Sequence, residues 1–180
     1  MNNLMKFSLI ALSFFGVTLI SASANAVELA HEDVIAMTQQ LEQRPLAPEA
    51  DDLRQQLYEW TTDSDEVQIS VCDVLGPIPS HEELPYAKEL LVQSFFGNAA
   101  YQLQHPASKN DQLKLQLAGI TSMLKAYRNI IKQQPEARIA TYDAWLKALD
   151  SDKLARQLLP TIAQKCLSDD PQQNQFAVLR

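Results

Sequence analysis

Residues 111–134 read DQLKLQLAGITSMLKAYRNIIKQQ, and this stretch decides the fold. Its apolar side chains recur at alternating spacings of four and three residues, which places them on one face of a helix. At ~1.5 Å per residue this helix is about 36 Å long, the longest that the sequence predicts. We expect it to be the spine of a helical bundle and to carry an apolar stripe of Leu113, Leu117, Ile120, Leu124, Tyr127 and Ile131.

The flanking sequence predicts shorter helices on both sides of this spine. After residue 26 the chain has nine prolines and only three glycines, and the prolines fall between segments with helical periodicity. The fold class that we expect is therefore all-α, with about six helices in a compact bundle. The other helices are expected at about residues 31–43, 48–60, 80–104, 135–149 and 154–166.

One segment departs from helical periodicity. Val67, Ile69 and Val71 alternate with polar residues, which is the period of a strand, but the sequence offers no second strand to pair with it. The residues Gly76-Pro77-Ile78-Pro79 then form a rigid turn. We therefore expect an irregular extended segment near residues 66–79.

The first 26 residues have the layout of a secretory signal peptide. The apolar run from Phe7 to Ile20 is shorter than the ~20 residues of a membrane-spanning helix. It is followed by small residues that end in Ala24-Asn25-Ala26, which favours cleavage after Ala26 over retention as a membrane anchor. We expect a periplasmic protein, if the source is a Gram-negative bacterium, with no stable membrane insertion after cleavage.

Cleavage would leave residues 27–180, which we divide into a single helical domain at 27–166 and a polar C-terminal tail at 167–180. Lys6 is the only charged residue of the leader, so its removal changes the net charge from −7 to −8. A protein this acidic would meet the phosphates of nucleic acid with like charge, so we expect no nucleic-acid partner.

Both cysteines, Cys72 and Cys166, lie after the leader. In an oxidising compartment such a pair most simply forms a structural disulfide. Two buried free thiols or a redox dithiol are the alternatives, although the chain has no Cys-x-x-Cys. If Cys72 were free and activated by a base, it could act as a nucleophile.

No sequence motif indicates a catalytic site, a metal or a cofactor. The three histidines have no helical i, i+3 or i, i+4 partner, and Gly-x-Ser-x-Gly and glycine-rich phosphate loops are absent. We therefore expect no cofactor and no metal. Asn98, near an apolar stripe, and Arg128, beside Tyr127, are candidate ligand-facing residues. The alternative is that both find local partners within the fold.

Residues 96–101, Phe-Gly-Asn-Ala-Ala-Tyr, resemble the first helix of a tetratricopeptide repeat. Ala126-Tyr127, with Pro135 eight residues after the tyrosine, is similar to the second helix and its exit. Gly97 and Tyr127 lie 30 residues apart, nearly a whole repeat, and no second copy follows. The resemblance covers about a quarter of the chain and implies a helical hairpin.

These observations favour a non-catalytic binding or protein-interaction role in the periplasm, with a protein or small-molecule partner that the sequence does not identify. Two alternatives remain open at this point. A small enzyme of the hydrolase type would need convergent polar residues in one pocket. An envelope-stress chaperone would need a large exposed apolar surface.

Overall fold

The computed structural model describes residues 29–167 except 71, 79–80 and 82, and no strand occurs among these residues. The expected all-α class is confirmed. Two 3₁₀ turns, Pro106–Ser108 and Pro135–Ala137, accompany the α-helices. The helices are α1 (His31–Gln43), α2 (Ala50–Asp63), α3 (Ala87–Gln104), α4 (Gln112–Gln133), α5 (Ala140–Asp150) and α6 (Leu154–Cys166).

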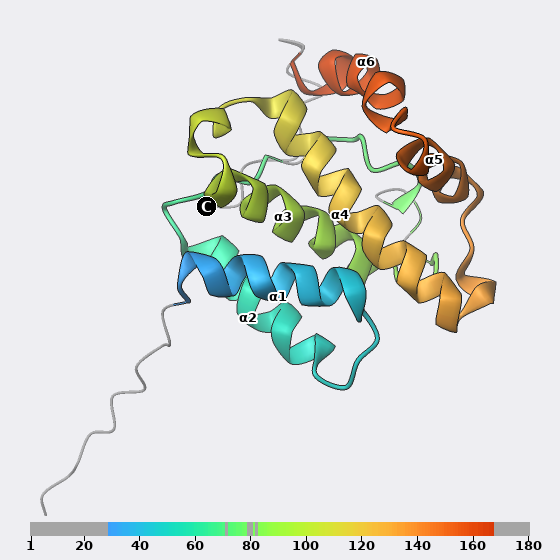
Figure 1. Cartoon of the computed structure of the whole chain (residues 1–180), viewed down its shortest axis with the longest axis horizontal. Helices are drawn as coiled ribbons and strands as arrows, with labels where there is room; N and C mark the ends of the chain where they lie inside the picture. The colour runs from blue at the N-terminus through green and yellow to red at the C-terminus, as the bar shows by residue number, and fades with distance from the viewer. Residues whose placement is uncertain (1–28, 71, 79–80, 82, 168–180) are drawn as a thin grey trace, which may run out of the picture.

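Helix α4 is the spine of the molecule, as its length and stripe predict. It contacts α1, α3, α5 and α6. In Figure 1, α3 and α4 lie side by side, with α1 and α2 on one side of the pair and α5 and α6 on the other. Helices α4, α5 and α6 contribute most of a large apolar core. A smaller apolar core lies between α1, α2 and α3.

Two glycines bring α3 and α4 unusually close together. A Cβ atom added to Gly97 would lie 2.2 Å from Cβ of Ser122, and one added to Gly119 would lie 2.6 Å from the backbone oxygen of Ser94. Both distances are far below van der Waals contact, so the two helices approach to a separation that only glycine allows. Gly97 of α3 and Gly119 of α4 thus each face the other helix.

The apolar stripe of α4 is buried from Ile120 onward, whereas Leu113 and Leu117 at its start are only partly buried. Ile120 and Leu124 are fully buried, whereas Leu117 is only partly buried at the edge of the core. The sequence groups Leu117 with Ile120 and Leu124 in one apolar stripe, but the structure places Leu117 at the edge of the core and not at its centre. The buried face of α4 also includes Gly119 and Ser122, because α3 packs against these two residues. Leu117 lies next to this contact and faces outward.

Truncation of Ile120 and of Leu117 should therefore have unequal effects. We expect Ile120→Ala to lower the free energy of unfolding by about 2–5 kcal/mol, because it leaves a cavity in a closed core. Leu117→Ala should cost less than half as much, because its side chain borders space that is open to water. Urea denaturation of both variants tests this order, and equal or inverted costs would contradict the position of Leu117.

The segment before α3 is extended and has no neighbouring strand, as its sequence predicts. Glutamine side chains make hydrogen bonds to its backbone where a neighbouring strand would otherwise do so. Gln102 Nε2 donates to the backbone oxygen of Gln68 (3.0 Å), and Gln102 Oε1 accepts from the backbone N–H of Gln68 (3.1 Å). Gln116 Nε2 donates to the backbone oxygen of Ser70 (2.6 Å). These bonds satisfy backbone groups that a β-ladder would otherwise pair.

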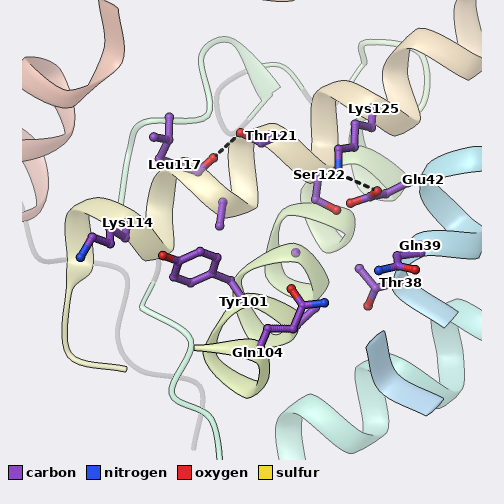
Figure 2. Close-up of a pocket in the computed structure, with 13 residues that line it drawn as sticks. Thr38, Gln39, Glu42, Tyr101, Gln104, Lys114, Leu117, Thr121, Ser122 and Lys125 are labelled. Atoms are coloured by element: carbon purple, nitrogen blue, oxygen red, sulfur yellow. Dashed lines mark hydrogen bonds and ion pairs between the residues drawn. The ribbon is translucent and has the colours of Figure 1, made fainter. Parts of the chain in front are cut away.

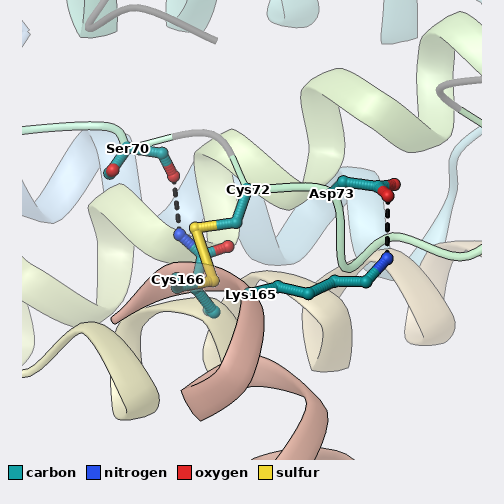
Figure 3. Close-up of a disulfide and its surroundings, with 6 residues drawn as sticks. Ser70, Cys72, Asp73, Lys165 and Cys166 are labelled. Atoms are coloured by element: carbon teal, nitrogen blue, oxygen red, sulfur yellow. Dashed lines mark hydrogen bonds and ion pairs between the residues drawn. A yellow bond between two sulfur atoms is a disulfide. The ribbon is translucent and has the colours of Figure 1, made fainter. Parts of the chain in front are cut away.

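A disulfide ties this segment to the last helix. Cys72 and Cys166 are paired, and their Cα atoms are 5.6 Å apart, within the usual range for a disulfide. Figure 3 shows the bond beside an ion pair between Asp73 and Lys165, whose atoms lie 2.7 Å apart. Among the described residues no free cysteine remains, so the structure assigns Cys72 to the crosslink rather than to a nucleophile.

Three helix boundaries differ from those expected. Helix α2 continues to Asp63, through residues expected to form a loop. Helix α3 begins at Ala87, about seven residues later than expected, because Tyr86 adopts a left-handed backbone with φ of 60°. Helix α5 begins at Ala140, because the backbone is extended before it and the N–H of Ile139 donates to the hydroxyl of Tyr127 (2.7 Å).

Candidate functional site

The two polar residues suggested by the sequence have partners within the fold. Asn98 is 3% exposed, and its Oδ1 accepts a hydrogen bond from Gln102 Nε2 at 2.8 Å. The guanidinium of Arg128 pairs with the carboxylate of Asp150, which joins α4 to α5. The structure does not bring Asn98 and Arg128 together, and neither lines the groove described next.

A groove of about 340 Å³ lies between α1, α3 and α4. Its volume is at the lower end of the ~300–1,000 Å³ typical of small-ligand sites. Figure 2 shows side chains from all three helices turned toward it. Its lining comprises Thr38, Gln39 and Glu42 of α1; Gly97, Ala100, Tyr101 and Gln104 of α3; and Lys114, Leu117, Ala118, Thr121, Ser122 and Lys125 of α4.

The floor of the groove is a buried polar junction. Gln93 lies beneath it, and its Nε2 donates to Ser122 Oγ (2.9 Å) and to the backbone oxygen of Thr38 (3.3 Å). Gln93, Ser122 and Thr38 are each less than 5% exposed. One amide therefore joins α1, α3 and α4 under the groove. Because buried polar groups are costly unless they are paired, this junction holds the three helices in register.

Ion pairs close both ends of the groove. Lys125 Nζ lies 3.0 Å from Glu42 Oε2, and the side chain of Glu42 is only 12% exposed. At the other end Lys114 Nζ lies 2.9 Å from Asp111 Oδ2. Hydrogen bonds from the side chain and backbone of Lys114 lower the pKa of Asp111, and the same pair raises the pKa of Lys114. The charges that border the groove are thus already balanced.

The aromatic side chain of the groove is itself partly covered. The rings of Tyr101 and His105 are stacked with centroids 4.1 Å apart and an interplanar angle of 19°. Figure 2 shows the hydroxyl of Tyr101 directed toward the Lys114 end, with Gln104 on the same helix. One face of the Tyr101 ring is therefore occupied by His105, and its edge and hydroxyl remain to line the groove.

A second hollow, of about 180 Å³, lies on the other side of α4. It is bordered by Leu149 of α5 and Leu154 of α6, and it shares Leu117 and Thr121 with the first groove. Leu117 thus forms a ridge between the two hollows. This position explains why Leu117 is less buried than the heptad pattern of α4 predicts.

The buried tyrosines serve the fold rather than acid–base chemistry near neutral pH. Burial raises the pKa of Tyr127 to about 12, although the N–H donated by Ile139 partly offsets this effect. The Tyr127 hydroxyl lies 2.9 Å from Asp143 Oδ1, to which it donates. Burial also raises the pKa of Tyr142, whose hydroxyl donates to the backbone oxygen of Leu75. Both side chains stay protonated through the physiological range.

The raised pKa of Tyr127 predicts a loss of stability at alkaline pH. The unfolded chain ionises Tyr127 near pH 10 but the folded chain only near 12, so the contribution is complete below pH 10 and declines as the pH rises toward 12. We expect Tyr127→Phe to flatten the fall in unfolding free energy over this range. Tyr58→Phe, which removes a hydroxyl from an exposed side chain, provides the control. Chemical denaturation between pH 9 and 12 measures both, and parallel curves for Tyr127→Phe and the unmodified chain would refute the assignment.

Sequence reasoning missed the groove. Its lining comes from residues 38–125, spread over three helices, and no local motif links them. No group of three or more histidine, cysteine, aspartate or glutamate side chains in the described part of the chain could hold a metal ion. No family model, no curated protein and no solved structure matches this chain.

Proposed function

We propose that this chain is an exported, non-catalytic binding protein and that the groove between α1, α3 and α4 is its binding site. The observation that carries the proposal is the construction of this groove. Exposed amides at its rim, Gln39 and Gln104, lie above a buried polar floor, and ion pairs stand at both ends. A few placed polar groups on a rigid, partly apolar surface are what small-ligand sites provide.

The groove supports binding better than catalysis. A nucleophile or general base needs a partner that activates it, and the pairs nearest the groove, Lys125 with Glu42 and Lys114 with Asp111, neutralise each other at its ends. The described residues also give little support to a chaperone. Only two of their large apolar side chains, Tyr58 and Leu167, are exposed. They form no large apolar face of the kind that captures unfolded chains.

Two observations support export. The leader at residues 1–26 lies outside the described residues, so its secretory layout rests on the sequence. The disulfide between Cys72 and Cys166 suits an oxidising compartment such as the periplasm. In the described part of the chain, no helix has the length and hydropathy required to cross a membrane.

Mass spectrometry of envelope protein should find Val27 at the N-terminus, and an intact Met1 in a membrane pellet would refute export.

The binding site can be tested by filling the groove. Ala118 lines it, so Ala118→Trp should occupy its space, whereas Ala144→Trp places the same side chain on the exposed face of α5. We expect the low-molecular-weight fraction of a periplasmic extract to shift the NMR resonances of groove residues in the unmodified protein and in Ala144→Trp, but not in Ala118→Trp. Shifts that survive in Ala118→Trp, or an extract that shifts no groove residue, would overturn the proposal.

A further inference from the structure

The molecule already holds one extended segment of polypeptide against α3. Gln102 makes two hydrogen bonds to the backbone of Gln68, one through its N–H and one through its oxygen. A side-chain amide can donate and accept at once, so it matches the paired N–H and C=O of a peptide. Gln116 of α4 adds a bond to the backbone oxygen of Ser70. The α3–α4 pair therefore recognises a backbone through glutamines.

The groove offers the same chemistry on the opposite side of α3. Gln104 follows Gln102 by two positions, which turns its side chain about 200° around the helix. Gln39 of α1 borders the same groove, and both residues are exposed. Neither amide hydrogen-bonds to another described residue, so both can still donate and accept. Figure 2 shows the two amides at the open side of the groove, one from each wall.

The floor adds a donor that the fold does not use. Ser122 is 3% exposed and its Oγ accepts from Gln93 Nε2 at 2.9 Å. Among the described residues its hydroxyl proton has no acceptor. A carbonyl oxygen that entered the groove could accept that proton and complete the hydrogen bonding of Ser122. The neighbouring lining residues Gly97 and Ala118 are small, so the groove stays deep beside Ser122.

The charge of the groove selects a neutral ligand. Lys125 is paired with Glu42 and Lys114 with Asp111, so a charged ligand would have to break one of these pairs. The remaining groups are amides and hydroxyls. A peptide backbone meets them with alternating neutral C=O and N–H groups. A sugar would more often stack on aromatic faces, but among the described lining residues Tyr101 is the only aromatic one, and His105 already covers one face of its ring.

From these contacts we infer that the groove binds a short extended peptide segment. Its backbone pairs with the side-chain amides of Gln39 and Gln104, and one of its carbonyl oxygens accepts a hydrogen bond from the hydroxyl of Ser122. This inference rests on the proposed function, because it names the ligand class of the same groove. The volume of about 340 Å³ limits the bound segment to a few residues.

The probe is acetyl-tetra-alanine amide, a neutral peptide with no functional side chains, titrated against the full exported chain and followed by NMR. We expect the side-chain amide resonances of Gln39 and Gln104 and the backbone resonance of Ser122 to shift together. Gln104→Leu should weaken binding by about fivefold or more, since it removes one or two hydrogen bonds of ~0.5–1.5 kcal/mol each. The matched control is Gln164→Leu on the exposed face of α6, which should bind as the unmodified chain does.

Two further probes separate the possible outcomes. The same tetrapeptide with each alanine nitrogen methylated and a dimethylamide at its C-terminus cannot donate hydrogen bonds. We therefore expect it not to bind, and equal binding would overturn backbone recognition. Maltotriose tests the sugar class. If maltotriose or the periplasmic extract shifts the groove resonances while tetra-alanine does not, the peptide inference fails and the proposed function stands. If none of the three shifts them, both fail.

Discussion

Gly119→Ala should be among the most destabilising single substitutions in this chain. The new Cβ would lie 2.6 Å from the backbone oxygen of Ser94, and a backbone atom cannot move without shifting α3. Overpacking typically costs ~1–3 kcal/mol, and we expect at least the upper end of that range. In a helix with free space, the same change would stabilise by up to ~1 kcal/mol, so the sign alone is informative. Urea denaturation at neutral pH is the measurement.

Gly97→Ala provides the comparison that locates the cause. Its Cβ would lie 2.2 Å from Cβ of Ser122, which is a side-chain atom that can be removed. In a double-mutant cycle, Ser122→Gly should recover part of the stability that Gly97→Ala loses. The same Ser122→Gly should not rescue Gly119→Ala, whose clash is with backbone. A neutral or stabilising Gly119→Ala, or rescue of both variants alike, would contradict the packing of α3 on α4.

Removal of the disulfide should have the second large effect. Cys72 and Cys166 are separated by 94 residues, and closing a loop of that size is worth roughly 4–5 kcal/mol in the chain-entropy model. Residual structure in the unfolded chain lowers this value, so we treat it as an upper bound. The variant with both cysteines replaced by serine should lose a large part of this stabilisation. The exposed Asp73–Lys165 pair beside the bond should contribute only about 0–1 kcal/mol, which Lys165→Ala measures as the control.

Removal of the disulfide should loosen the parts of the fold that it joins more than the rest of the fold. Without it, the segment around Cys72 and the end of α6 lose their covalent connection, whereas Gly97 and Gly119 still hold α3 against α4. Hydrogen exchange should therefore accelerate first at residues 67–78 and in α6. Non-reducing peptide mapping of exported protein must find Cys72 joined to Cys166. Two alkylatable thiols in that sample would refute the crosslink and would reopen the nucleophile hypothesis for Cys72.

The sequence predicted the elements whose causes are local. Helix α1 has the bounds expected for it, and α3 ends where its pattern stops before Pro106. The helix starts were less predictable. Helix α3 was expected from about residue 80 but begins at Ala87, after a left-handed backbone at Tyr86 and without a side-chain cap. At α4 the cap is Asp111, whose side chain accepts from the N–H of Lys114.

The candidate site was beyond the reach of sequence reasoning. Asn98 was singled out because a polar residue beside an apolar stripe is unusual, and its partner Gln102 lies one helical turn away. Gln39, Gln104 and Ser122 carried no such signal. An exposed glutamine on a helix is ordinary until another helix is placed opposite it. The role of Ser122 depends on Gln93 beneath it, 29 residues earlier in the chain.

The sequence by itself determined the helical class, the spine at residues 111–134, the unpaired extended segment and the only cysteine pair that the chain can form. These features follow from hydrophobic periodicity and turn residues, which depend on a few neighbouring positions, and from residue counts, which depend on the whole composition. Only the tertiary structure decided that α3 and α4 meet at Gly97 and Gly119, that Leu117 is a ridge, and that three helices enclose a polar groove. These features depend on distances between segments far apart in the chain, which are set by packing and not by any local pattern.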